Sequence, residues 1–229
     1  MRLDRFLSKT TGLSRKEATK LLQREKVTVE GVVQKKAAFQ VPNGAEVIWN
    51  HERLELAGPT YLMMHKPLGC VCANNDPMHM TVFAYLDLPN FDELHTVGRL
   101  DLDTSGLLLI TDDGKWSHRI TSPKQQCPKT YHAWLADPVT AADVSAFAEG
   151  LQLHGEATLT APAVLEIINE RDALVHVHEG RYHQVRRMFA AMGNKVEQLH
   201  REQVGALKLD AGLAPGEFRV LTAEEVALF

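Results

Sequence analysis

One stretch of the chain joins charged side chains to a short apolar run, GRLDLDTSGLLLITDDG over residues 98–114. Arg99 and Asp101 stand shortly before Leu107–Ile110, which we predict to be a buried strand. An arginine and a carboxylate beside such a strand are costly to desolvate unless they are paired or used in a reaction. A carboxylate held in this way suits a nucleophile or a general base. A solvated acidic turn before the strand is the simpler alternative.

Two further side chains have the chemistry to complete a site. The segment CPKTYHAWL alternates like a strand and places Tyr131 on one face with Ala133 and Leu135. Arg186 lies on the shoulder of the apolar face of a helix predicted within residues 179–194. A carboxylate, an aromatic ring and an arginine suit a reaction that needs a nucleophile or base and a platform for a planar group. Taken singly, the tyrosine and the arginine are equally compatible with purely structural roles.

Asp103, two residues after Asp101, permits a different chemistry. Paired carboxylates are typical of glycoside hydrolases, so a nucleosidase or glycosidase is a competing enzyme class. We interpret Asp103 instead as a turn residue that bonds local backbone amides. The sequence contains neither GxxxxGK[ST] nor GxGxxG, and its eleven histidines show no zinc-type spacing around Cys70 and Cys72. We therefore expect no cofactor and no metal.

Charge is divided unevenly along the chain. The net charge is −4, but residues 1–40 carry ten Lys or Arg against four Asp or Glu, and residues 41–229 carry fifteen against twenty-five. A basic module joined to an acidic body indicates that the first segment binds a polyanion. The sparse cysteines, with no leader and no long apolar run, predict a cytoplasmic protein.

The first segment contains a basic helix. Ser14 and Glu17 form a capping-box pattern at the start of SRKEATKLLQR. Lys16, Lys20 and Arg24 follow at intervals of four residues on the face opposite the apolar one. Like charges in such a row destabilise a helix unless an anion lies beside them, and RNA phosphates would supply it. A solvated basic face is the simpler alternative.

The remainder of the chain has the pattern of an α+β domain. After residue 60 strands outnumber helices and are joined mostly by turns, which favours a mixed, mostly antiparallel sheet with flanking helices. The polar segment His51–Pro59 reads as a linker, so we place the domains at residues 1–57 and 58–229. We expect a loop at 87–92 and a turn in HKPLG that presents Lys66.

The motifs resemble known families. The runs RLDRFLSK, SRKEATKLL and VTVEG are similar to the alpha-L (S4-like) RNA-binding motif, and HKPLG, GRLDxDTSGLLLIT and GRYHQVRRM resemble the RsuA family of pseudouridine synthases. The likeness spans essentially the whole chain. It implies isomerisation of a uridine in ribosomal RNA, in the small-subunit RNA or its assembly intermediate, with large-subunit RNA as the alternative. A non-enzymatic RNA-binding assembly factor is a further alternative.

The resemblance also implies roles for individual residues. It implies that Asp101 is the aspartate that the reaction requires and that the ring of Tyr131 packs on the target base. It also implies that Arg186 is the basic partner of Asp101. Arg99 becomes a contact to the flipped nucleotide. We expect other RNA contacts from Arg15, Lys16, Lys20, Lys66 and Arg187, and we expect a monomer.

Overall fold

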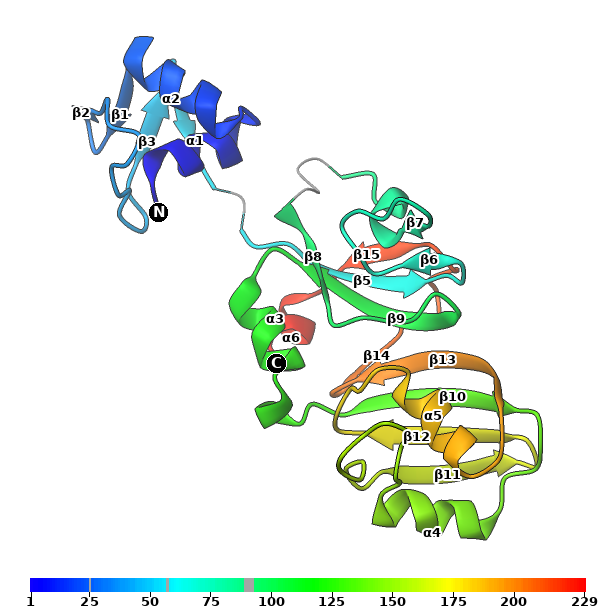
Figure 1. Cartoon of the computed structure of the whole chain (residues 1–229). Coiled ribbons are helices and arrows are strands. Elements are labelled where there is room, and N and C mark those ends of the chain that lie inside the picture. The colour runs from blue at the N-terminus through cyan, green and yellow to red at the C-terminus, as the bar shows by residue number, and fades with distance from the viewer. Residues whose placement is uncertain (25, 57, 89–92) are drawn as a thin grey trace. The chain divides into compact units, whose positions relative to one another are not determined.

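The computed structural model describes residues 1–24, 26–56, 58–88 and 93–229 (Figure 1). The chain forms two compact units, Met1–Pro59 and Thr60–Phe229. Residue 57, in the predicted linker, and residues 89–92, in the loop predicted at 87–92, lie outside the described residues. Among the helices of the described ranges, none has the length and apolar character needed to cross a membrane.

The N-terminal unit packs two helices against a small antiparallel sheet. The helices are α1 (Leu3–Thr11) and α2 (Arg15–Arg24), and the strands are β1 (Val27–Val29), β2 (Val32–Val33), β3 (Val47–Trp49) and β4 (Glu52–Leu54), in the order β2-β1-β3-β4. The predicted capping box is confirmed, because Glu17 Oε2 accepts a hydrogen bond from Ser14 N at 2.9 Å and Ser14 Oγ accepts one from Glu17 N at 3.3 Å. The apolar face of α2 is buried, and Lys16 and Lys20 are exposed on its other side.

The second unit is built on one mixed sheet. Within the described residues its nine strands are β5 (Tyr61–Lys66), β8 (His95–Val97), β9 (Thr104–Thr111), β10 (Lys129–Leu135), β11 (Val164–Asn169), β12 (Asp172–Val177), β13 (Val196–Val204), β14 (Leu207–Lys208) and β15 (Phe218–Val220). Their main order is β11-β12-β10-β13-β9-β5-β15, while β8 pairs with β9 and β14 with β13. The β9–β13 pair is parallel and the other pairs are antiparallel, which confirms the predicted fold class.

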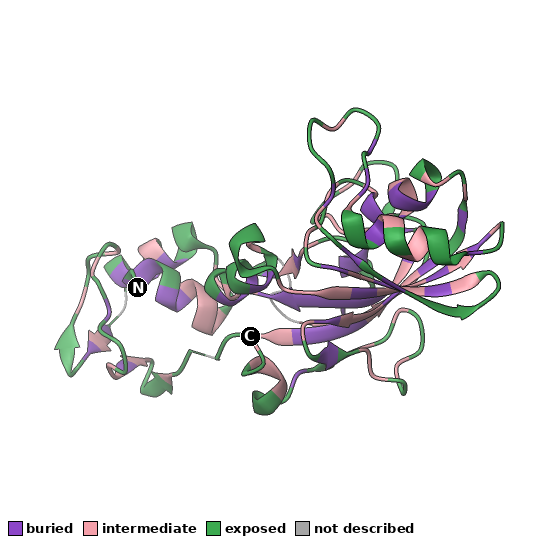
Figure 2. Cartoon of the chain, turned by 90° about the horizontal axis from the view of Figure 1, so that it is seen from below, coloured by how far each residue is buried: buried purple, intermediate pink, exposed green. Residues whose placement is uncertain are grey.

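Helices and a short strand pair flank this sheet. They are β6 (Cys70–Val71), β7 (Met80–Thr81), η1 (Val82–Tyr85), α3 (Gly114–Thr121), η3 (Pro123–Gln125), α4 (Ala141–Glu149), α5 (Gln184–Ala191) and α6 (Ala223–Val226). Figure 2 shows the central strands largely buried and the outer sides of the helices exposed.

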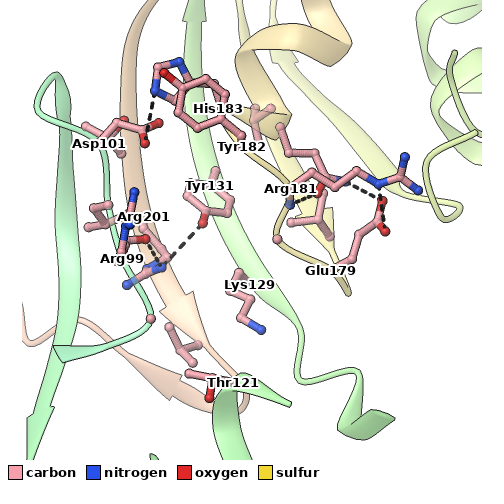
Figure 3. A pocket seen from close by; sticks show the side chains of 18 of the residues that line it. Arg99, Asp101, Thr121, Lys129, Tyr131, Glu179, Arg181, Tyr182, His183 and Arg201 are labelled. Carbon is pink, nitrogen blue, oxygen red and sulfur yellow. Dashed lines mark hydrogen bonds and ion pairs between the residues drawn. The ribbon is translucent and has the colours of Figure 1, made fainter. Parts of the chain in front are cut away.

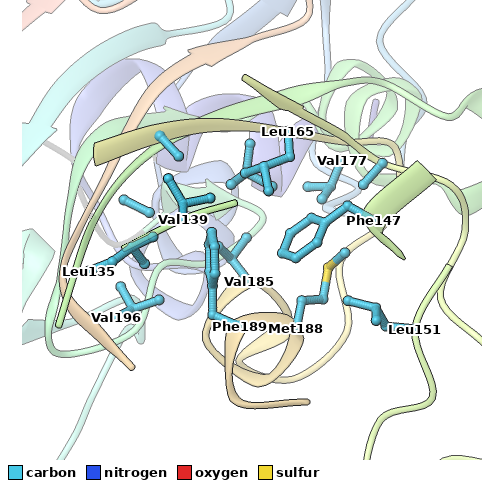
Figure 4. Packing of buried hydrophobic residues seen from close by; sticks show 14 of the residues in the cluster. Leu135, Val139, Phe147, Leu151, Leu165, Val177, Val185, Met188, Phe189 and Val196 are labelled. Atoms are coloured by element: carbon cyan, nitrogen blue, oxygen red, sulfur yellow. The ribbon is translucent and has the colours of Figure 1, made fainter. Parts of the chain in front are cut away.

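The two halves of the sheet are covered differently. β5 and β9 are buried on both faces, because Leu108 packs in a cluster with η1 and Leu109 in another with α3. The predicted strand Leu107–Ile110 is therefore an unbroken apolar run inside β9. In the other half, α4 and α5 cover one face, where Phe147 and Phe189 pack against each other and the sheet (Figure 4).

The parallel β9–β13 pair joins the two halves and depends on a glycine. Gly106 lies opposite Arg201 in the register of this pair and has a φ of +111°. A Cβ atom at Gly106 would overlap the carbonyl oxygen of Arg201. Glycine is required here both by the backbone conformation and by the close approach of the two strands.

Candidate active site

A pocket of about 620 Å³ opens beside the join between the two halves (Figure 3). One wall comes from the loop after β8, with Arg99 and Asp101, and another from β10, with Lys129 and Tyr131. Arg201 of β13 and the turn before α5 complete the lining. The second unit has fourteen Lys or Arg against twenty-two Asp or Glu, yet basic residues outnumber acidic ones around this pocket. Such a local reversal of charge attracts an anion.

Asp101 lies on a rigid turn that leads into β9. The ammonium Nζ of Lys66 donates to the carbonyl oxygen of Asp101 at 2.9 Å and to that of Thr104 at 2.8 Å. The carboxylate itself is 29% exposed and lines the pocket. Its Oδ1 atom lies 3.4 Å from Nε2 of His183. The backbone of Asp101 is thus fixed while its side chain remains accessible from the pocket.

The prediction that Lys66 contacts RNA is wrong. Its side chain is fully buried, and Nζ also donates to the carbonyl oxygen of Pro67 at 3.0 Å. Three acceptors for one nitrogen require the ammonium form, although burial lowers the pKa of Lys66 from its usual value. The physical reason is that β5 continues through Lys66, whose side chain points into the interior instead of being presented on a turn.

Tyr131 lines the pocket on the face of β10 that the alternation predicted. Its hydroxyl lies 3.5 Å from Nη1 of Arg201, and the guanidinium carbon of Arg201 lies 6.0 Å from the ring centre. Arg201 is 3% exposed, and its Nε donates to the carbonyl oxygen of Leu107 at 2.8 Å. Its Nη2 has no hydrogen-bond partner among the described residues. One sequence signal could have found Arg201. It lies two residues after Leu199, so both side chains lie on the same, buried face of the strand.

Lys129 is a second pocket cation that sequence reasoning missed. It lies two residues before Tyr131 on the same face of β10 (Figure 3). Nζ donates to the carbonyl oxygen of Cys127 at 2.6 Å. Burial lowers the pKa of Lys129, the Cys127 thiol opposes this shift, and the positive charge of Arg201 adds to it.

Arg186 does not pair with Asp101, contrary to the prediction. Its Nη2 donates to the carbonyl oxygen of Asp103 at 2.9 Å and lies 3.1 Å from Oδ2 of the same residue. Its Nη1 donates to the carbonyl oxygen of Val196 at 3.0 Å. The Arg186 guanidinium is held by Asp103 and Val196, and His183, the residue before the first residue of α5, lies beside Asp101 instead. Asp103 therefore receives a guanidinium, where we expected local amides.

The guanidinium of Arg187 is bound within the protein, although its side chain remains 24% exposed, and its contact to RNA stays a prediction. Nη1 donates to Glu156 Oε1 at 2.9 Å and to the carbonyl oxygen of Tyr182 at 3.1 Å. Nη2 donates to the carbonyl oxygen of His154 at 2.7 Å. The loop between α4 and β11, through His154 and Glu156, therefore binds the arginine that we expected to meet solvent or RNA.

In the N-terminal unit the predicted RNA contacts differ in how they are held. Lys16 and Lys20 are exposed on α2. Arg15 binds Asp4, with 2.9 Å between Nη2 and Oδ2. Hydrogen bonds from Arg2 and Arg15, opposed by burial, lower the pKa of Asp4 to about 2. Arg15 thus stabilises the unit, and its side chain still remains 58% exposed.

Across the described ranges, no group of three or more His, Cys, Asp or Glu side chains is placed to hold a metal ion. The three cysteines are free thiols, with Cys70 buried.

The fold and pocket define an enzyme domain that offers a carboxylate and an aromatic ring inside a cationic cavity, joined to a small basic unit. Residues 60–191 match the model of the RNA pseudouridylate synthase family, and residues 1–47 match the S4 domain. The chain therefore belongs to the RNA pseudouridylate synthase family and is an RNA pseudouridine synthase with an N-terminal S4 domain.

Individual relatives agree with this assignment. The chain is 55% identical to the ribosomal small subunit pseudouridine synthase A of Vibrio cholerae serotype O1, over 99% of this chain and 98% of the relative. It is 50% identical to the protein of the same name from Escherichia coli strain K12, over 99% of each. A crystal structure of a pseudouridylate synthase matches with a TM-score of 0.73 and 45% identity, covering 100% of both chains.

Proposed function

We propose that this enzyme isomerises a uridine of small-subunit ribosomal RNA, free or partly assembled, with Asp101 as the catalytic carboxylate. In this proposal residues 1–57 bind RNA and residues 58–229 catalyse the reaction, in a monomer that works in the cytoplasm. The observation that carries it is the Asp101 carboxylate, accessible on a rigid turn and lining the same pocket as Tyr131. The names of the relatives support the small-subunit substrate.

The reaction explains why the site needs few groups. The bond between uracil N1 and the ribose carbon breaks, the base turns, and a bond forms from uracil C5 to the same ribose carbon. The C5 proton is released and N1 takes up a proton, so that the product is an isomer of the substrate. No electron is gained or lost and no group is added, so the chain's own residues suffice. Asp101 supports cleavage of the glycosidic bond.

Tyr131 holds the base. A base inside a duplex must be flipped out, which costs a few kcal/mol, and stacking on an aromatic ring returns about 1–3 kcal/mol. The face of Tyr131 that looks into the pocket provides such a ring. Arg99, at the same wall, contacts the flipped nucleotide.

Arg186 acts as a positioning residue in this proposal. It binds Asp103 through both the carbonyl and the carboxylate, and so holds the far side of the turn that carries Asp101. Lys66 holds the near side through the carbonyls of Asp101 and Thr104. Two buried or half-buried cations therefore fix one reactive carboxylate.

A tritium-release experiment tests the catalytic role. Small-subunit RNA labelled at uracil C5 is incubated with the wild-type enzyme, Asp101→Asn and Asp103→Asn in EDTA. We expect Asp101→Asn to lose at least ~10³-fold in rate while RNA binding is kept, because the carboxylate acts only in the reaction. Asp103→Asn, the matched control on the same turn, is expected to lose less than ~10-fold.

The other candidate functions give different results in the same experiment. Release of free uracil would identify an N-glycosidase, and labelled large-subunit RNA as the better substrate would move the target. Full activity of Asp101→Asn would exclude Asp101 as the catalytic carboxylate. Pseudouridine formed by neither form of the enzyme, with RNA binding kept, would favour an assembly factor.

A further inference from the structure

A stacked aromatic pair stands at the mouth of the pocket. Tyr182 is 70% exposed, and its ring lies on that of His183 with centroids 3.9 Å apart and planes 18° from parallel (Figure 3). Both residues line the pocket, and Nε2 of His183 lies 3.4 Å from Oδ1 of Asp101. The outer face of the Tyr182 ring is therefore an exposed aromatic surface. Its inner face lies on His183, which in turn lies beside the catalytic carboxylate of Asp101.

The backbone that presents this pair is unusual. His183 has φ of 47° and ψ of 38°, the left-handed conformation, although it is not a glycine. A residue held in that region costs about 1–3 kcal/mol and persists only where its surroundings enforce it. The side chain of His183 makes no capping bond to α5 in the described part of the chain; it lies against Tyr182 and Asp101 instead.

The surrounding turn is rigid. Arg181 donates to the carbonyl oxygens of Thr158 at 2.9 Å and Leu159 at 2.6 Å, and its backbone N–H donates to Gln184 Oε1 at 2.8 Å. The large exposed ring of Tyr182 is thus carried on a well-anchored turn, in the manner of a preorganised binding surface.

We propose that Tyr182, supported by His183, is a second base-stacking platform that receives the nucleotide next to the uridine in the pocket. This inference rests on the proposed function. Tyr131 lies inside the pocket and serves the target base, whereas only the outer face of Tyr182 is free, since His183 covers the inner one. Because every base has a π-face, the platform accepts any neighbouring base and contributes affinity more than sequence choice.

Binding is measured in the Asp101→Asn background, where RNA is not turned over, with the small-subunit transcript as probe. Removing the ring by Tyr182→Leu is expected to raise Kd by about 5- to 150-fold, the equivalent of one stack of about 1–3 kcal/mol. Tyr182→Phe, which keeps the ring, stays within about twofold of the parent. The matched control is Tyr85→Leu, at an exposed tyrosine of η1 outside the pocket lining, and its Kd is unchanged.

A fluorescent variant reports the contact directly. In Tyr182→Trp the added indole emission is expected to be quenched as RNA saturates the protein, beyond any change seen with the parent. An abasic nucleotide beside the modified uridine should remove this quenching, and Tyr182→Leu should then cause no further loss of affinity. Equal affinity of Tyr182→Leu and Tyr182→Phe, or unchanged indole emission with RNA bound, would overturn the platform without touching the role of Asp101.

Discussion

The basic side chains of the two units do different work. On α2 of the N-terminal unit, Lys16 and Lys20 project into solvent. In the catalytic unit, Lys66, Arg187 and Arg201 are buried or half-buried, and each donates to backbone carbonyl oxygens. Exposed charges attract a polyanion over a distance set by salt, whereas bound charges fix local geometry and are screened little. The exposed lysines of α2 are thus suited to attract a polyanion, whereas these three cations of the catalytic unit hold backbone segments in place.

The largest expected effect comes from removing Lys66, a cation that holds buried backbone carbonyl groups. Lys66→Met leaves three buried carbonyl oxygens without their donor, so we expect the free energy of unfolding to fall by about 3–5 kcal/mol and Tm by roughly 10 °C. Calorimetry of the full chain measures both. The control Lys124→Met, at an exposed lysine, should change stability by less than about 0.5 kcal/mol. A Lys66→Met protein that is as stable as the wild type but binds RNA more weakly would show that Lys66 contacts RNA and has no structural role.

A smaller effect is expected from replacing the exposed lysines of α2. Lys16→Glu combined with Lys20→Glu should weaken RNA binding about 10-fold at low salt and reduce the slope of log K against log salt by roughly 1–2, because two phosphate contacts are lost. Filter binding over a series of salt concentrations measures the slope, and Tm should stay the same. The pair Lys35→Glu and Lys36→Glu, exposed in the same unit but off the helix, is the control. An unaltered slope would mean that α2 does not face RNA.

The most local effect concerns Asp4, whose pKa of about 2 lies below the usual 3.8. A depressed carboxyl pKa stabilises the folded state above the unfolded pKa, and this stabilisation disappears as pH falls from about 4 to about 2. We expect α1 to lose about 1–2 kcal/mol of protection over that range, measured by hydrogen exchange of its amides. Asp4→Asn should flatten this acid dependence. An equally steep loss in Asp4→Asn would assign it to other carboxylates.

Features set by local periodicity were predictable from the sequence. The capping box at Ser14, the strand at Leu107–Ile110 and the facing of Tyr131 depend on local periodicity, and the structure confirms all three. The mixed sheet was predictable because strands joined by turns leave few other packings. Local patterns therefore predicted the main helices and strands and the strand face that places Tyr131 in the pocket.

Partners of charged side chains were not predictable in the same way. Arg186 pairs with Asp103 on a turn far away in the sequence, and Lys66 is buried because β5 extends to it. Both outcomes depend on contacts between segments far apart in the chain. The left-handed conformation of His183 could not be predicted from its residue type. The burial of Arg201 was weakly predictable, because Arg201 lies two residues after Leu199 in the same strand.

The glycine at the β9–β13 join also constrains how this fold can diversify. Asp101 precedes β9 in one half of the sheet, whereas Tyr131 and His183 belong to the other half. The separation between these groups therefore depends on how closely β9 and β13 approach each other. A side chain at Gly106 would wedge the halves apart and separate the carboxylate from the rings. A side chain at the join would therefore disturb the site, although Gly106 itself takes no part in the chemistry.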